Sequence, residues 1–140
     1  MRTYVFNVTP NTAPRQTRKD KWNPRPCVLK YRAFKDALRA EVAKADFKPD
    51  VDLLEYFHVV FVIPFPKSYS KKKRRELLGT PHRQTPDKDN LEKGFLDALL
   101  KQDCAVYDGR VTKIWGEVGK IQVSVDFPPE LVAFDIQVTE

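Results

Sequence analysis

The segment TPDKDNLEKGFLDALLKQDCAVYDGRV, residues 85–111, decides how this chain folds. Its middle, Asn90–Lys101, repeats apolar side chains at helical spacing and predicts a helix. The stretch Ala105–Glu117 is rich in β-forming residues and predicts a strand directly after that helix. The apolar side of the helix comprises Leu91, Phe95, Ala98, Leu99 and Leu100.

Two acids two residues apart stand at the head of this segment. Pro86 favours extended backbone around it, and side chains two apart in an extended stretch point the same way, so Asp87 and Asp89 can face one cation. Oxygen ligands suit hard cations such as Mg²⁺. The alternative is structural, because Asp89 followed by Glu92 resembles a capping box at a helix start. The two roles for Asp89 are compatible.

A lysine follows Asp89 by four residues and therefore lies one helical turn further along the same side. A cation in the first turn opposes the helix dipole at a cost of about 0.3–1 kcal/mol, which is typical of a residue needed for an anion. The alternatives for Lys93 are an ion pair with Asp97 and a plain surface lysine. Asp97 itself lies among apolar neighbours, so we expect a supporting role for it at most.

A third acid follows the helix. A helix that hairpins into the next strand would return Asp108 to the Asp87 and Asp89 end of the segment. Asp103 is a rival third ligand, and the residues alone do not choose between Asp103 and Asp108 because each lies near a turn.

Further elements are predicted on both sides of this segment. Pro10–Pro26 is rich in proline and basic residues, which excludes a helix or a central strand and predicts a long basic loop. The stretch Val28–Lys44 predicts an amphipathic helix with Leu29, Ala33, Ala37 and Ala40 near one face, Phe34, Leu38 and Val42 beside them, and charges over the remainder. The other expected elements are strands at Thr3–Val8, Tyr56–Phe65 (buried), Lys120–Phe127 and Leu131–Val138, a basic helix within Ser68–Leu78 capped by Ser68 or Ser70, and a connector at Gly79–Pro86.

The length of 140 residues fits a single domain spanning residues 1–140. No apolar run approaches the roughly 20 residues of a membrane span, and Met1–Thr9 has no secretory pattern, so we expect a cytoplasmic protein. Cys27 and Cys104 form no C-x-x-C pair, and we expect both to be reduced and structural. Together with the two histidines they match no zinc-site spacing.

Charge is divided unevenly along the chain. Residues 1–84 hold 19 Lys or Arg and 8 Asp or Glu, a net charge of +11, whereas residues 85–140 hold 6 and 11, a net charge of −5. A basic half favours an anionic partner, most simply nucleic acid, and the acidic cluster favours a cation. The alternative is a solvated surface with uneven charge.

The candidate DNA-backbone contacts form two basic sets and one further arginine close to the acids. The alternative for the lysine run is a localisation or solubilising patch. Two aromatic residues, Tyr69 and Tyr107, are candidates for stacking on unpaired bases, although packing is the expected role of each. The basic candidates are Arg15, Arg18, Lys19, Lys21 and Arg25 in the loop, Lys71, Lys72, Lys73, Arg74 and Arg75 in the basic helix, and Arg83.

The motif PDKDNLEKGFLDAL followed by VYDGRV resembles the signature of the RusA family of crossover-junction endodeoxyribonucleases. That signature is an Asp-x-Asp-Asn, a Lys four residues past the second Asp, an Asp-Ala-Leu in the same helix, and a final Asp on the next strand. The family spacing from Asp87 selects Asp108 over Asp103. Many members carry an Asp-Asp pair where this chain has Tyr107–Asp108, and the second acid is the one kept here.

The resemblance is strong over residues 56–125. Upstream, IPFPKSYSKKKRRELLG is similar to the lead-in of phage and prophage members, and KIWGEVGKIQVSV resembles the strands that close the domain. The resemblance implies an α+β fold with a small mixed β-sheet flanked by helices, a homodimer, and dependence on Mg²⁺ or Mn²⁺ without a nucleotide cofactor. It also implies paired cuts in a four-way DNA junction during recombination and repair. Asp87, Asp89 and Asp108 would then be the metal ligands, and Lys93 a fourth catalytic residue.

Three other functions remain as alternatives. A non-catalytic branched-DNA-binding module would keep the basic sets but has no use for three converging acids, which repel DNA without a metal. A nuclease acting on flaps or forks would use the same site. An inactive prophage remnant is the third alternative, and the intact acids and Lys93 argue against it.

Overall fold

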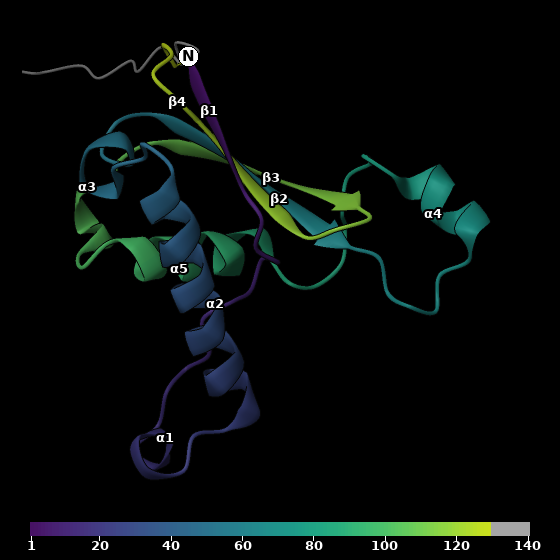
Figure 1. Cartoon of the computed structure of the whole chain (residues 1–140), viewed down its shortest axis with the longest axis horizontal. Coiled ribbons are helices and arrows are strands. Elements are labelled where there is room, and N and C mark those ends of the chain that lie inside the picture. Colours follow the sequence, from purple (N-terminus) through teal and green to yellow (C-terminus); the bar gives the residue numbers. More distant parts are fainter. Residues whose placement is uncertain (130–140) are drawn as a thin grey trace, which may run out of the picture.

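The computed structural model describes residues 1–129, and the expected strand Leu131–Val138 lies outside them. Figure 1 shows helices α2 and α5 beneath a twisted sheet, with α1 and α4 projecting away from it in different directions. In chain order the elements are β1 (Arg2–Phe6), α1 (Lys19–Trp22), α2 (Pro26–Lys44), α3 (Pro49–Asp52), β2 (Phe57–Pro64), α4 (Lys71–Leu77), α5 (Lys88–Leu99), the 3₁₀ turn η1 (Asp103–Ala105), β3 (Gly109–Gly116) and β4 (Lys120–Val125).

The four strands form one mixed sheet in the order β1-β4-β2-β3. β4 pairs antiparallel with β1 and with β2, whereas β2 and β3 run parallel. A parallel pair needs a long crossover, and the segment carrying α4 and α5 supplies it. The expected α+β class with a mixed sheet is confirmed.

Strand β2 shows how the core is divided between the two faces of the sheet. Phe57, Val59 and Phe61 are fully buried, while the residues between them are half-buried. The ring of Phe61 meets that of Phe95 in α5 edge to face, with centroids 6.0 Å apart. Helices α2 and α5 therefore cover one face, and the prediction of complete burial for this strand is wrong because no described helix packs on the other.

The apolar side predicted for α2 is confirmed in part, because Phe34, Leu38 and Val42 are buried whereas Leu29 and the alanines are not. Leu29 is 51% exposed, and the alanines expected beside it are exposed as well. The large side chains recur every three or four residues, and turning them inward buries more apolar area than a stripe of alanines would. The buried side chains of α2 are Val28, Tyr31, Phe34, Leu38 and Val42.

Several boundaries also differ. The basic loop contains the short helix α1, and α2 begins at Pro26, where the missing N–H of proline costs nothing in a first turn. Helix α4 is confirmed, with Ser70 as its cap: the hydroxyl Oγ accepts from the backbone N of Lys73 at 3.2 Å. Among residues 1–129, no helix combines the length and apolar character that crossing a bilayer requires.

Candidate active site

Helix α5 presents its first two acids to solvent. It begins at Lys88, two residues earlier than predicted, and Asp87 is its N-cap with extended backbone (φ −71°, ψ 149°). The Asp87 carbonyl accepts from Leu91 N at 3.0 Å, but its carboxylate makes no capping hydrogen bond. Both acids are exposed, so both carboxylates are available to a cation, and the helix dipole favours negative charge there.

Two expectations about these acids are wrong. Asp89 is not the N-cap, because Asp87 already occupies that position and Asp89 lies within the first turn. The pair does not share one extended stretch, because the backbone turns helical immediately after Asp87. Glu92, the other residue of the expected capping box, is half-buried, and this burial raises its pKa. The charge of Lys88 lowers the pKa of Glu92, and that of Asp89 raises it.

Lys93 follows one turn after Asp89 and is exposed. Within residues 1–129, the ion pairs include none between Lys93 and Asp97. The ion pair with Asp97 is therefore not formed, and Lys93 is exposed, which fits both an anion contact and a plain surface lysine.

The connector (residues 79–86) holds the start of α5 in place along the edge of β3. Trp115 N donates to Thr80 O at 3.0 Å, and His82 N donates to Lys113 O at 3.0 Å. The imidazole of His82 is buried against Trp115, with ring centroids 4.4 Å apart. The chain therefore arrives at Asp87 from a segment that is hydrogen-bonded to the sheet.

The side chain of Lys113 holds the end of the connector through two hydrogen bonds. Its Nζ donates to Gln84 O at 2.7 Å and to Pro86 O at 2.8 Å, directly before Asp87. Sequence reasoning missed this residue. The signal was its place between Val111 and Trp115 on the helix-covered face of β3, where strand alternation predicts an apolar side chain.

An open cleft of about 460 Å³ adjoins the acids. Asp87 and Asn90 line it from α5, Lys30 lines it from α2, and Pro10–Thr12 close it from the N-terminal segment. The same segment crosses α5 at Gly94, where a Cβ would lie 2.8 Å from Asn11 O.

The hydroxyl of Tyr31 ties α2 to this part of α5 by donating to Gly94 O at 2.8 Å. Burial, with a contribution from the charge of Asp97, raises the pKa of Tyr31 to about 12. The phenol therefore keeps its proton and its hydrogen bond at neutral pH, which helps to fix the helix that carries the acids.

Asp108 lies at the other end of α5. The far end of that helix and Ala105 line a cleft with Leu54, and Gly109 pairs with Phe57 at the beginning of β2. Twelve residues of helix rise about 18 Å, so the chain reverses far from Asp87. Within residues 1–129, no group of three or more acids, histidines or cysteines lies close enough to hold a metal ion.

The expectation that a hairpin returns Asp108 to Asp87 and Asp89 is therefore wrong within one chain. Asp103 lies in η1 beyond the same end of the helix and does not replace it. Tyr107, beside Asp108, is 71% exposed, so the packing expected for it is not found. Tyr69 does pack, with its ring 5.7 Å from that of Trp115. Both cysteines are free, and both are exposed rather than structural.

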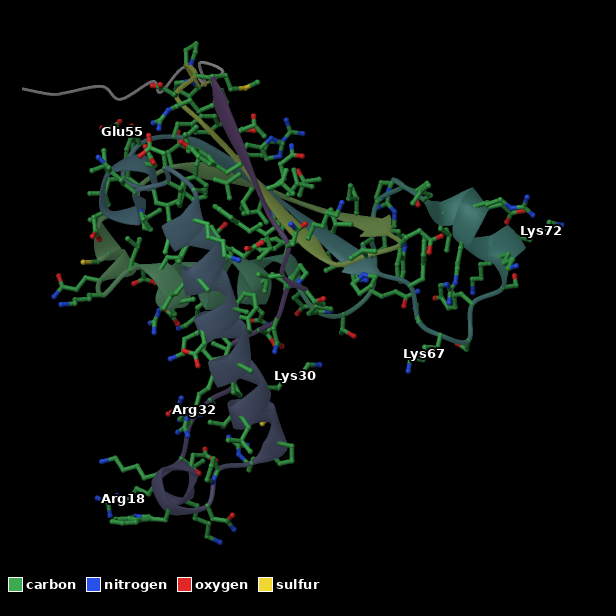
Figure 2. All side chains as sticks on the ribbon, in the orientation of Figure 1. Arg18, Lys30, Arg32, Glu55, Lys67 and Lys72 are labelled. Carbon is green, nitrogen blue, oxygen red and sulfur yellow. The ribbon has the colours of Figure 1, made fainter. Side chains whose placement is uncertain are left out.

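The two basic sets project from the body on either side of the start of α5. In Figure 2, Arg18 and Lys72 lie at two separate extremities of the molecule, with Lys30 between them. Some cations are already engaged: Lys73 Nζ lies 3.9 Å from the Tyr69 ring centroid, and Arg74 pairs with Glu117 at 3.7 Å. Arg25 and Lys73 are exposed but engaged with Asp20 and Tyr69, and the other exposed candidates are Arg15, Arg18, Lys19, Lys21, Lys71, Lys72, Arg75 and Arg83.

Comparison with known proteins adds a family assignment. The family model described as "Endodeoxyribonuclease RusA" matches residues 6–126, which is most of the chain. No curated protein matches the chain. The matched range includes strands β2, β3 and β4 but only Phe6 of β1. It also includes both ends of α5 and both basic sets.

Proposed function

This chain belongs to the RusA family of endodeoxyribonucleases, and from that premise we propose that it resolves four-way DNA junctions by paired, Mg²⁺-dependent strand cuts in recombination and repair. The family is one of divalent-metal-dependent, Holliday-junction-resolving endonucleases that bind branched DNA. The observation that carries the proposal is the exposed set of Asp87, Asp89 and Lys93 at the start of α5, flanked by two projecting basic elements.

The donors at the start of α5 fit Mg²⁺, with Mn²⁺ as a substitute. Mg²⁺ takes oxygen ligands, keeps several waters, and is usually held by one or two carboxylates together with phosphate oxygens. Asp87 and Asp89 provide two exposed carboxylates, and that of Asp87 is not consumed by helix capping. We assign both as metal ligands.

We assign the third ligand, Asp108, to the other protomer of a homodimer. The separation of Asp108 from Asp87 within one chain supports this assignment, because the three acids of the family signature would then meet across an interface. In a dimer with twofold symmetry, each site combines Asp87 and Asp89 of one protomer with Asp108 of the partner subunit. Two equivalent sites also suit a nearly symmetric four-way junction.

When bound, the metal supplies Lewis-acid chemistry and a water of lowered pKa for in-line attack on the scissile phosphate. Lys93 places a positive charge one turn from Asp89, where it balances the negative charge that develops on that phosphate. The resemblance implies products with a 5′-phosphate and a 3′-hydroxyl, which can be religated.

The two basic sets serve as contacts to the DNA backbone. Arg15, Arg18, Lys19 and Lys21 serve in one set, and Lys71, Lys72, Lys73 and Arg75 are the exposed members of the other. Because the sets project in different directions on either side of the acids, they suit two duplex arms that diverge from a branch. Such contacts weaken steeply as salt rises.

The test is cleavage of a mobile four-way junction beside a matched linear duplex, with Mg²⁺ or with EDTA. Paired, ligatable nicks confined to the junction and abolished by EDTA are expected. Equal cleavage of flaps or forks would instead establish the alternative specificity. Tight binding without cleavage of any branched substrate, in Mg²⁺ or Mn²⁺, would leave a DNA-binding module or an inactive remnant.

A further inference from the structure

The basic arm (residues 15–25) carries a tryptophan whose side chain is almost fully exposed to solvent. Figure 1 shows α1 beyond the end of α2, far from the sheet. Trp22 lies in this helix and is 87% exposed, whereas Trp115, the other tryptophan of the chain, is 5% exposed. Tryptophan is on average highly buried in folded proteins, so an almost fully exposed indole at a projecting tip calls for a partner.

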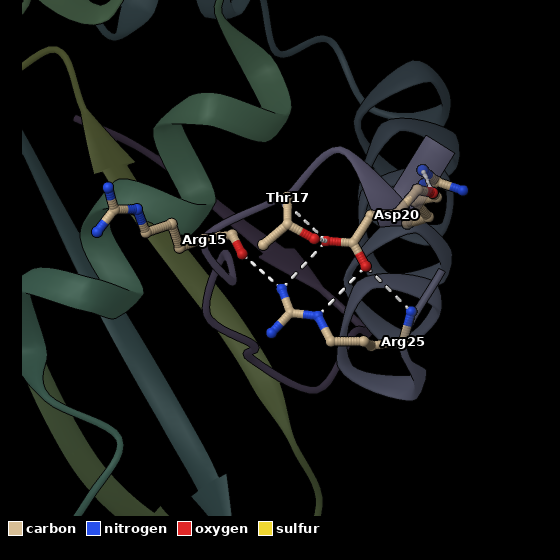
Figure 3. A network of polar contacts seen from close by, with 5 residues as sticks. Arg15, Thr17, Asp20 and Arg25 are labelled. Carbon is tan, nitrogen blue, oxygen red and sulfur yellow. Dashed lines mark hydrogen bonds and ion pairs between the residues drawn. The ribbon is translucent and has the colours of Figure 1, made fainter. Parts of the chain in front are cut away.

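The arm is ordered by a buried carboxylate. Asp20 is 1% exposed and accepts hydrogen bonds from Thr17 N at 2.7 Å and from Arg25 N at 3.2 Å (Figure 3). The guanidinium of Arg25 adds contacts through Nε at 3.2 Å and Nη2 at 3.1 Å, and Nη2 also reaches Arg15 O at 2.5 Å. These bonds close residues 15–25 into a compact loop, so Trp22 is presented on a defined support.

The charge of the arm selects an anionic partner. Asp20 is the sole acid in residues 15–25, and its charge is compensated by Arg25. The exposed cations Arg18, Lys19 and Lys21 lie within four residues of Trp22 in the same arm. Cations that track a phosphate backbone, combined with an aromatic ring on which a base can stack, are the features of surfaces that bind unpaired nucleic acid.

A stacking partner for Trp22 must have an open face. Bases inside a linear duplex are covered on both sides by their neighbours, whereas bases at a branch point lose a neighbour. The indole therefore distinguishes branched from linear DNA, and the cations, which contact phosphates, do not.

We propose that Trp22 stacks on an unstacked base at the branch point of the DNA and is a specificity-determining residue for branched substrates. This inference rests on the proposed function, since it takes branched DNA to be the substrate. In Figure 2, Lys30, which lines the cleft beside Asp87, lies between the arm and the start of α5.

The two tryptophans allow a direct test in EDTA, where the junction is not cut. Trp115 is enclosed by Phe65 and His82, so quenching of fluorescence by DNA reports on Trp22. The full-length protein is titrated with a four-way junction and with a matched duplex at one salt concentration. Strong quenching by the junction and weak quenching by the duplex are expected.

Variants complete the test. Trp22→Ala is expected to weaken junction binding roughly 5- to 100-fold, the range for one base–aromatic stack, and duplex binding by less than about 2-fold. Trp22→Phe should recover most of the junction affinity. Val118→Ala, which also removes an exposed apolar side chain, should change neither affinity.

Equal losses on junction and duplex, or no quenching by the junction, would overturn the inference. Trp22→Ala is expected to keep Mg²⁺-dependent cleavage at saturating enzyme, because the acids are untouched. A failure of stacking in a protein that still cuts junctions would refute the role of Trp22 alone, whereas absence of cleavage in the wild type would refute the proposed function.

Discussion

The two ends of helix α5 carry acids of one family signature, yet they are built differently. At the start, the connector is hydrogen-bonded to β3, and Lys113 holds the two carbonyls that precede Asp87. At the far end, the chain reverses through η1, and Asp108 lies beside the exposed ring of Tyr107. One end is a supported site for a cation, whereas at the other end the exposed acids Asp103 and Asp108 lie in and just after a short turn.

The difference teaches that acids close in sequence need not meet within one chain. Asp87 and Asp108 lie on either side of a helix about 18 Å long, and the strand that follows begins near the far end of that helix, which keeps the two acids apart. Separate experiments therefore test the start of α5, its far end, and the groups that support each.

The largest effect is expected from the acid at the start of the helix. Asp89→Asn should slow junction cleavage by at least about 10³-fold, because a metal ligand is lost, and should leave binding in EDTA intact. Asp97→Asn, an exposed acid two turns further along, should change the rate by less than about 2-fold. Single-turnover cleavage measures both rates. Equal losses of rate in the two variants would show that the start of α5 has no special role in cleavage.

Mixing two inactive variants tests whether the ends meet across a dimer. In a heterodimer of Asp89→Asn and Asp108→Asn, one site receives both substitutions and the other receives none. Co-expression with random pairing should restore about a quarter of the wild-type sites, since half of the dimers are mixed and each has one intact site. If the co-expressed variants stay inactive, Asp108 acts within its own chain or not at all.

The close packing of residues 11–13 against the middle of α5 is tested at Gly94. A Cβ there would lie 2.8 Å from Asn11 O and 3.1 Å from Ala13 N, both backbone atoms that cannot rotate away. Gly94→Ala should lower the free energy of unfolding by about 1–3 kcal/mol, as overpacking does. Urea titration measures the change, with Ala37→Gly on the exposed side of α2 as a control for helix propensity. An unchanged or raised stability would show that residues 11–13 are not held against α5.

The support of the start is tested at Lys113. Lys113→Met keeps the aliphatic stem and removes the ammonium that donates to Gln84 O and Pro86 O. The Mg²⁺ concentration for half-maximal cleavage should rise about 10-fold, as it does when a group that orients metal ligands is lost. Lys113→Arg should recover part of this loss, and Lys120→Met, at the exposed first residue of β4, should have no effect. An unchanged Mg²⁺ requirement for Lys113→Met would mean that the connector is positioned without it.

The smallest effect concerns pH and the connector. Burial, and secondarily the charge of Lys113, lowers the pKa of His82 below its usual 6.5. The stabilisation from its neutral form is complete above pH 6.5 and is lost as the pH falls through the lower pKa of the folded protein. The free energy of unfolding of the wild type should therefore fall more between pH 7.5 and 5 than that of His82→Leu. Parallel pH profiles would show that the imidazole is solvated.

Sequence patterns predicted most elements but not their faces. The helix that became α5 and the basic helix α4 were predicted because periodicity and capping residues act locally. The buried side of α2 was predicted in part: Phe34, Leu38 and Val42 are buried as expected, but Leu29 and the alanines are exposed because the larger side chains cover the sheet. Trp22 was overlooked because nothing in its neighbours indicates that it stays in water.

The sequence by itself determined the chemistry: the two acids at the head of a helix, the lysine one turn later, the basic sets, and the spacing that identifies the family. Those features depend on residue type and on short-range geometry. The tertiary structure alone decided that Asp108 lies at the opposite end of α5, that Lys113 supports Asp87, and that Asp20 orders the basic arm. These outcomes depend on the direction in which the nine residues between α5 and β3 turn and on contacts between residues far apart in the chain, and no local pattern specifies either.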